Sequence, residues 1–569
     1  MVTAVLLAGL TVGAMAQAPE GTPGEKMAAT IIRERPVEGA PKGAWGYEEG
    51  VLLDGLAAEW RATGNKADFD YIQAAADQYV TKDGTILNYK AQGHTLDDIE
   101  MGRAVLLMYR TTQKKRYAEA AEFLHEQLAV QPRTASGGYW HKEIYPNQMW
   151  LDGAYMAEPF RAAYAATFDV PQDWDDIAKQ LLLMDEHMRD PKTGLLRHGW
   201  DESKQMPWAD KTTGLSPEAW GRADGWYAMA LVDVLDWFPK DNPHRPELVA
   251  ALKRTMAAVL KVQDPQTGLW WQVMDQAGRK GNYLEASASC MFVYTLAKGV
   301  RMGYLPQSDE ADARRGWEGI QKKFVTVGPD GGLVLHGTVK VGGLGGKPYR
   351  SGTFDYYIHE PVRDQDLKGV GSFLKADAEM QQAGTEAMGQ GKTALMDAWF
   401  NSQTRKNALG QTALFHYKWN DDSYDGYSFF GRAFQRYGVR LAEDRSAPTA
   451  EALKKAQIYV IVSPDIPAKN PNPHYMDKAS ADVIEAWVKA GGVLMLFSND
   501  PGNGEIEHYD ILSDRFGIHF NPVLSHHVVD PDHTTGEVAI PPGTGIFGEG
   551  FTAYMKDTCT ITVSGPAKA

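Results

Sequence analysis

Cysteine is nearly absent from this chain of 569 residues: only Cys290 and Cys559 occur. The two lie in segments that we assign to different domains, so the sequence offers neither a disulfide framework nor a thiolate metal site. Runs of Lys or Arg that could follow a phosphate backbone are also missing, and the formal net charge is -15 with a sequence pI near 5.5. We therefore expect no nucleic-acid partner.

Membrane-length apolar runs are missing too. One apolar stretch, residues 1–18, is shorter than the about 20 residues that span a bilayer, and no other segment approaches that length. It ends in small residues around Ala14, Ala16 and Ala18 that suit signal-peptidase cleavage, although the usual basic start is missing. We expect a signal peptide at 1–18, no membrane span, and a secreted or periplasmic protein. A truncated or misassigned start and an apolar end without function are the alternatives.

Helical periodicity, in contrast, is abundant. Apolar residues recur at helical spacing in successive segments, which Gly, Pro and Asp punctuators such as DPKTG and DPQTG separate. These segments are 48–63, 68–81, 98–112, 116–130, 148–166, 172–189, 217–238, 246–263, 285–302 and 309–325. About a dozen helices in this pattern fit a closed ring of inner and outer helices, with a site in the mouth that loops form at one end.

The composition and hydrophobic pattern of the sequence change after the helical segments. Gly-rich, strand-like text begins near residue 330 and precedes a last helix. We expect a polar linker at 383–409, and then apolar runs such as TALFHYKW, QIYVIVSP and GGVLMLFS alternate with helical segments, which predicts an α/β domain at 410–569. With a linker at 19–41 and an all-α domain at 42–382, the sequence predicts a multidomain protein.

Two Asp residues stand out in the all-α domain. Asp152 lies inside the apolar helical text MWLDGAYM, where an ionised carboxylate is costly, so it is either paired or suited to proton transfer. A structural Asp that braces the helix explains the same position equally well. Asp97, in HTLDDIEMGR, stands at a predicted helix start, where capping and the helix dipole favour Asp for structural reasons alone.

Imidazole, guanidinium and indole groups accompany these acids. His141 and His198 are each compatible with a purely structural role. Arg222 lies between Trp220 and Trp226 in AWGRADGW, which offers a donor fork for a carboxylate and stacking platforms for sugar rings. A buried Arg that braces a helix start is the alternative. No His, Asp or Glu spacing matches a zinc or calcium signature such as HExxH or an EF-hand loop, so we expect no metal and no cofactor.

Five long motifs occur in order between about residues 45 and 376. They are GGYWHKEIYPNQMWLDGAYMAEPF, HGWDES, WADKTTGLSPEAWGRADGWYAMALVDVL, NYLEASASCMFVYTLAKGVRMGYL and GGKPYRSGTFDYY. With these motifs the chain closely resembles glycoside hydrolase family 105, the unsaturated rhamnogalacturonyl hydrolases. The resemblance implies an (α/α)6 barrel, in agreement with the helical pattern. The α/β region resembles the flavodoxin-like or glutamine-amidotransferase-like accessory domains of some bacterial members.

The resemblance also implies roles for the residues that match the family motifs. Asp152 corresponds to the catalytic proton donor and base, and Asp97 to its acidic partner. The matching substrate-binding positions are His141, His198, Arg222, Trp220, Trp226, Trp150 and Tyr47. The family substrate carries a C4=C5 double bond in a terminal uronic acid, which a polysaccharide lyase leaves behind.

We therefore expect a hydrolase that removes a terminal 4,5-unsaturated uronic acid from lyase-generated oligosaccharides by hydrating this double bond, with rhamnogalacturonan fragments as the first candidates. Unsaturated glucuronyl ends of ulvan or arabinogalactan fragments compete with them. Two other classes stay open: a non-catalytic carbohydrate-binding protein and an isomerase that uses His141 and His198 as acid and base. Ser463 lacks the flanking glycines of a nucleophile elbow, so the α/β domain is expected to be structural or to contact sugar.

Overall fold

The computed structural model describes residues 21–39, 41, 43, 45–385, 388–423, 425–525, 527–529, 536–543 and 550–565. The signal peptide expected at 1–18 lies outside these residues. Two compact units are formed, one by Glu20–Thr385 and one containing Glu386–Ala569. Across the described ranges, no helix combines the length and the apolar character needed to cross a membrane.

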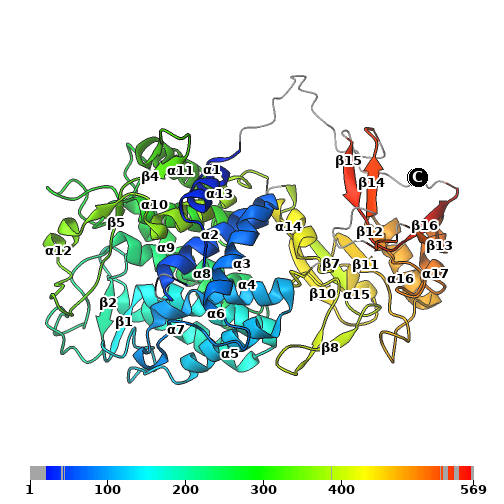
Figure 1. The fold of residues 1–569 in the computed structure, drawn as a ribbon, viewed down its shortest axis with the longest axis horizontal. Coiled ribbons are helices and arrows are strands. Elements are labelled where there is room, and N and C mark those ends of the chain that lie inside the picture. The colour runs from blue at the N-terminus through cyan, green and yellow to red at the C-terminus, as the bar shows by residue number, and fades with distance from the viewer. Residues whose placement is uncertain are drawn as a thin grey trace. The chain divides into compact units, whose positions relative to one another are not determined.

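Six inner helices contact one another in a closed ring in the first unit, counted over its described residues. Figure 1 labels them among the helices coloured from blue to green. In the order in which they contact one another they are α2 (Tyr47–Thr63), α4 (Gly102–Thr112), α6 (Leu151–Phe168), α8 (Gly221–Trp237), α10 (Ala286–Arg301) and α13 (Leu367–Met380), which packs back on α2. Each carries an outer helix, in the same order α3 (Lys66–Tyr79), α5 (Lys115–Ala129), α7 (Trp174–Met188), α9 (Arg245–Lys261), α11 (Glu310–Phe324) and α1 (Pro23–Glu34). This is the ring of inner and outer helices that the sequence predicts.

Helix α1 lies inside the segment 19–41, which was expected to be a linker, and that expectation is wrong over these residues. A capping box starts the helix: Glu25 donates its backbone N–H to Thr22 Oγ1 (3.2 Å), and the Glu25 carboxylate accepts from the Thr22 N–H (2.7 Å). Met27 and Ile31 are buried, and α1 packs on α13. The chain's first helix is therefore the outer partner of the barrel's last inner helix.

Helices α2 and α13 approach each other closely through glycine. A side chain on Gly371 would meet the Val51 carbonyl oxygen at 2.1 Å, and one on Gly55 would meet the Gly371 carbonyl oxygen at 2.6 Å. Backbone therefore packs on backbone at this point, and the ring closes tightly between its first and last inner helices.

Five charged side chains and one tyrosine on the barrel axis connect all six inner helices. This axial ion network comprises Asp54 (α2), Arg103 (α4), Tyr155 (α6), Asp233 (α8), Lys298 (α10) and Lys375 (α13). Lys375 Nζ lies 2.5 Å from Asp54 Oδ2 and 2.7 Å from Asp233 Oδ2, and Arg103 lies 3.0 Å from each carboxylate. Burial acts to raise the pKa of the Asp233 carboxyl, but Lys298, Lys375 and Arg103 hold it well below its usual range.

Short antiparallel strands lie between the helices. Strand β1 (Gln148–Trp150) pairs with β2 (Gly199–Asp201) and runs directly into α6. The strand-like text near residue 330 forms two more pairs, β3 (Val325–Val327) with β4 (Leu333–Leu335) and β5 (Thr338–Val339) with β6 (Val362–Arg363). The six-residue helix α12 (Phe354–His359) lies between β5 and β6 in the sequence.

The second unit contains a four-stranded parallel sheet in the order β10-β7-β11-β12. Its strands are β7 (Thr393–Asp397), β10 (Arg440–Asp444), β11 (Ile458–Val462) and β12 (Val493–Phe497). Alternate residues point to opposite faces: Tyr459 packs in a cluster with Ile484 of α16 (Lys478–Lys489), and Val460 in another with Phe430 of α14 (Ser428–Arg436). Helices cover both faces, which explains the continuous apolar text of β11 and β12.

The linker expected at 383–409 is also wrong, because the fully buried strand β7 lies inside it. The run TALFHYKW supplies only β9 (Thr412–Leu414), which pairs with β8 (Thr404–Lys406) outside the parallel sheet. The remaining elements are α15 (Ala450–Leu453), α17 (Asp510–Ser513), and the pairs of β13 (Ile518–Ser525) with β16 (Thr558–Val563) and β14 (Glu537–Ile540) with β15 (Phe551–Tyr554).

Candidate active site

Asp152 occupies the first turn of α6, directly after β1. The pairing of β1 with β2 brings His198 beside it, since Leu151 donates its backbone N–H to the His198 carbonyl (3.0 Å). Asp152 Oδ2 lies 3.0 Å from His198 Nε2, and the Asp152 side chain keeps 14% of its surface exposed. Among the described residues neither atom has an aligned hydrogen bond, so the contact is close but leaves the carboxylate able to turn toward a ligand.

Asp97 comes from the short 3-10 helix Leu96–Ile99 that precedes α4. Its Oδ2 lies 2.6 Å from Lys142 Nζ and its Oδ1 lies 3.4 Å from His141 Nε2. Burial acts to raise the pKa of the Asp97 carboxyl, but Lys142 and His141 bring it below its usual range. Asp97 is therefore a carboxylate at neutral pH. Lys142 was not among the expected site residues, although it stands next to His141 in the sequence.

His141 is buried in a stack of rings. Its ring lies 4.6 Å from that of Trp150, whose other neighbour is Tyr145 at 4.7 Å. Burial lowers the pKa of His141 to about 4, although Asp97 acts to raise it, so the imidazole is neutral at neutral pH. Arg350, from the segment before α12, donates to the Tyr145 hydroxyl (2.7 Å) and extends the stack. The sequence indicated neither Tyr145 nor Arg350.

Tyr47 is the first residue of α2. Burial raises the pKa of its hydroxyl well above the usual value, and the charges of Asp97, Glu48 and Asp152 add to this shift. The phenol therefore keeps its proton, and the negative charges of Asp97 and Asp152 both act on it. Asp97 lies 3.4 Å from His141, whose ring lies 4.6 Å from that of Trp150, two residues before Asp152.

Arg222 and the two Trp residues around it lie deeper than expected. Arg222 is 1% exposed: its Nε donates to Ser287 Oγ (2.8 Å), and its Nη atoms donate to the backbone carbonyls of β5 residue Val339 and of Lys340. Trp226 stacks on Tyr155 (4.8 Å), and Trp220 packs 4.7 Å from His198 behind the site. As a substrate clamp Arg222 stays a prediction, one that this geometry does not favour, because the side chain is buried and each of its three nitrogens already donates to a protein oxygen.

The site residues come from the same end of the inner helices. Tyr47 begins α2, Asp97 precedes α4, Asp152 lies in the first turn of α6 and Arg222 in the first turn of α8. The N-terminal ends of helices carry partial positive charge from the backbone dipoles. An anionic substrate is therefore favoured here despite the net negative charge of the chain.

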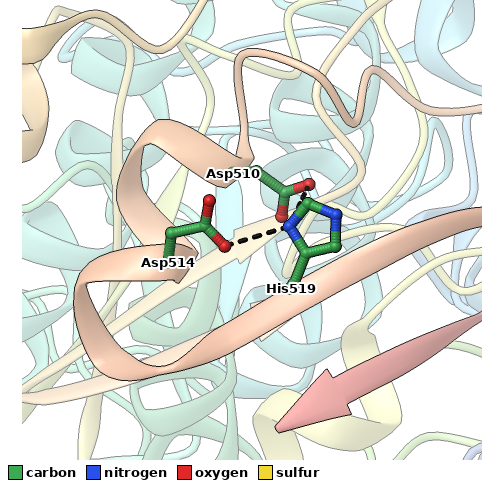
Figure 2. Close-up of side chains that lie close together, drawn as sticks. All are labelled: Asp510, Asp514 and His519. Atoms are coloured by element: carbon green, nitrogen blue, oxygen red, sulfur yellow. Dashed lines mark hydrogen bonds and ion pairs between the residues drawn. The ribbon is translucent and has the colours of Figure 1, made fainter. Parts of the chain in front are cut away.

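One group of side chains, among the described residues, has ligand atoms close enough to hold a metal ion, and it lies in the second unit. His519 Nδ1 is 3.3 Å from Asp510 Oδ2 and 3.0 Å from Asp514 Oδ1 (Figure 2). The hydrogen bond to Asp514 and the charge of Asp510 raise the pKa of His519, which favours the imidazolium. A protonated imidazole is not a metal ligand, so an ion pair between α17 and β13 accounts for these contacts.

Residues 24–383 match the sequence model of Glycosyl Hydrolase Family 88, which is more than half of the chain. The chain belongs to this family. It is therefore a glycoside hydrolase, as the sequence predicts. The family match begins in α1, the helix that the sequence analysis missed, and it ends just before the second unit.

Solved and curated relatives agree with this assignment. The structure of a family 105 glycoside hydrolase from C. acetobutylicum ATCC 824 is 42% identical, covers 63% of this chain and 99% of that one, and has a TM-score of 0.61. Protein Atu3128 of Agrobacterium fabrum is 40% identical over 231 residues, 39% of this chain and 97% of that protein. Unsaturated rhamnogalacturonyl hydrolase YesR of Bacillus subtilis is 27% identical over 252 residues, 43% and 68% of the two chains. The expected resemblance to family 105 is confirmed.

Proposed function

We propose that this enzyme removes a terminal 4,5-unsaturated uronic acid from lyase-generated oligosaccharides by hydrating its C4=C5 double bond. The observation that carries the proposal is that two carboxylates at the same end of the inner helices have unlike surroundings: Asp97 is paired with Lys142, whereas Asp152 lies 3.0 Å from His198 Nε2. Unlike surroundings suit one acid to stabilise charge and the other to move a proton. The named activity of the YesR relative supports the same chemistry.

The reaction adds the elements of water across the double bond. Asp152 gives its proton to C4, and the Asp97 carboxylate stabilises the positive charge that develops at C5 and the ring oxygen. Asp152, now ionised, takes a proton from a water molecule whose oxygen bonds to C5, which restores the acid. The resulting hemiketal opens to a C5 ketone, and C1 then releases the remaining oligosaccharide as an alcohol.

The substrate carboxylate needs a cation, and Lys142 fits this role better than Arg222. Lys142 keeps a quarter of its side chain exposed at the Asp97 side of the pocket, while Arg222 is buried with its donors in use. An ammonium that bridges Asp97 and the substrate carboxylate would also hold the sugar ring against the acid that stabilises its charge.

Rhamnogalacturonan fragments are the first candidate substrates, on the strength of the YesR relative. The unsaturated 3S-rhamnoglycuronyl hydrolase of Alteromonas sp. (strain LOR), 24% identical over 254 residues, supports glucuronyl ends as the second candidate.

We propose that the second unit is an accessory domain with a flavodoxin-like fold. Its parallel strands, numbered along the chain, have the order 2-1-3-4. Ser463 follows β11 with φ 41°, but Pro464 comes next and no helix begins there, so we propose no nucleophile.

The test is the loss of the ultraviolet absorbance of the conjugated double bond on lyase-generated oligosaccharides from rhamnogalacturonan and from ulvan. We expect the wild type to bleach one set faster, and Asp152→Asn to lower kcat by about 10²–10⁴-fold. Asp169→Asn, at the exposed C-cap of the same helix, is the matched control and should keep wild-type kcat. If the folded wild type binds the oligosaccharides without consuming them, the protein is a binding protein; if it converts the sugar without releasing it, it is an isomerase.

A further inference from the structure

The ring of His198 is held by a residue that lies outside the expected site. Tyr357, on α12, places its hydroxyl 2.7 Å from His198 Nδ1. Both side chains are fully buried, and the Tyr357 ring stacks on Trp220 at 5.6 Å. The contact joins α12, about 160 residues further along the chain, to the strand that carries His198. Tyr357 is therefore fixed in place independently of His198.

The direction of this hydrogen bond follows from where the protons can go. Burial raises the pKa of the Tyr357 phenol well above its usual value, and Tyr356 and Asp152 add to the shift, so the phenol carries its proton. Among the described residues, the hydroxyl has His198 Nδ1 as its hydrogen-bond partner. A buried O–H without an acceptor is costly, so the phenol donates and Nδ1 accepts.

We propose that Tyr357 is a positioning residue: it donates to His198 Nδ1 and so fixes the imidazole in the tautomer that carries its proton on Nε2, beside Asp152. In a neutral imidazole the nitrogen that accepts a hydrogen bond carries the lone pair, so the proton sits on the other nitrogen. Nε2 lies 3.0 Å from Asp152 Oδ2, where an N–H attracts a carboxylate and a lone pair would repel it. This proposal rests on the proposed function for its kinetic consequences alone.

With its proton fixed on Nε2 and its lone pair used at Nδ1, His198 is a donor toward Asp152 rather than an acid or base of its own. The donor draws the Asp152 carboxylate into one orientation between proton transfers. That orientation decides which oxygen meets C4 and the attacking water. The same arrangement leaves no lone pair on His198 for an isomerase that needs two histidines.

The test replaces the donor and keeps the ring. Tyr357→Phe retains the stacking on Trp220, and we expect kcat to fall about 10- to 100-fold with KM unchanged. The matched control is Tyr227→Phe, which also removes a buried hydroxyl, one that donates to the Leu181 carbonyl (2.8 Å) on the outer side of α8. Its kcat should stay at the wild-type value. Wild-type kcat in Tyr357→Phe would overturn the proposal.

A double-mutant cycle separates positioning from a general loss of packing. In a His198→Gln background Tyr357→Phe should cause no further loss of kcat, because the residue that it positions is gone. A full additional loss would show that Tyr357 acts elsewhere, against the proposal.

The tautomer of His198 can be measured directly by ¹⁵N nuclear magnetic resonance, without any substrate. In protein that contains ¹⁵N-labelled histidine, with His198 assigned by its loss in His198→Gln, we expect the Nε2 signal of a protonated nitrogen and the Nδ1 signal of an acceptor. In Tyr357→Phe the two signals should move toward each other as both tautomers are populated. A protonated Nδ1 in the wild type would refute the proposal. This measurement stands even if no oligosaccharide is consumed, an outcome that refutes the proposed function alone.

Discussion

Asp152 and Tyr155 lie three residues apart on α6, about one helical turn or roughly 4.5 Å along its axis, and they belong to two levels of the barrel that treat buried charge in opposite ways. At the level of Tyr155, the axial ion network pairs each carboxylate with at least two cations. At the level of Asp152, His141 Nδ1 has no hydrogen-bond partner among the described residues, and Asp152 Oδ2 has only the unaligned 3.0 Å contact with His198 Nε2. The ion pairs of the axial network stabilise the barrel. The polar atoms near Asp152 that lack an aligned hydrogen bond can form one with the proposed substrate.

The largest effect is expected from a substitution in the axial ion network. Asp233→Asn keeps the shape of the side chain but leaves Arg103, Lys298 and Lys375 with one fewer anion in a buried site. We expect the free energy of unfolding to fall by about 3–5 kcal/mol, measured by urea unfolding at neutral pH. The kcat of the folded enzyme should be unchanged.

The control for that loss is Asp312→Asn on the outer helix α11, which removes a partly exposed ion pair with Arg315 (2.8 Å). It should cost at most about 1 kcal/mol. Equal unfolding curves for Asp233→Asn and wild type would mean that the axial ion network does not stabilise the barrel.

A smaller effect is expected at the level of Asp152. Lys142→Met should raise KM roughly 10- to 100-fold, because the substrate carboxylate loses a hydrogen bond from a charged donor worth about 1.5–3 kcal/mol. Lys115→Met, an exposed lysine of α5, is the matched control for the lost charge. An unchanged KM for Lys142→Met would mean that Arg222 or another group, and not Lys142, binds the substrate carboxylate.

The smallest effect concerns Asp98, which lies beside Asp97 but belongs to neither level. Burial, with help from Asp97, raises the pKa of Asp98 to about 6. The folded state keeps this proton between about pH 4 and pH 6 while the unfolded state releases it, so Asp98 lowers stability as the pH rises through that window.

Asp98→Asn should remove this step. Relative to wild type, the variant should gain on the order of 1 kcal/mol of unfolding free energy at pH 7 over its value at pH 4, after allowance for solvent screening. Urea unfolding of both proteins at the two pH values measures the difference, in which the other titrating groups cancel. A constant difference between the two proteins would contradict the raised pKa.

Several features could be predicted from the sequence because they follow from local patterns. Helical periodicity predicted most of the inner and outer helices, and the motif around Asp152 led to the proposal of a catalytic acid in the first turn of α6. Helix α1 could also have been found, since Thr22, Pro23 and Glu25 form a capping signature. Strand β7 could not, because five buried residues between polar stretches look the same whether they form a strand or part of a linker.

The sequence by itself determined the family and the two-part organisation, and it proposed Asp97 and Asp152 as site residues, since each of these depends on local motifs and patterns. The tertiary structure alone decided that Arg222 turns inward to β5, that Lys142 pairs with Asp97, and that Tyr357 reaches His198. It also decided the axial ion network, in which each inner helix contributes one side chain. These contacts join residues far apart in sequence. The face that each helix turns inward is set only when the ring closes, because buried charges are then stabilised by pairing with side chains from the other helices.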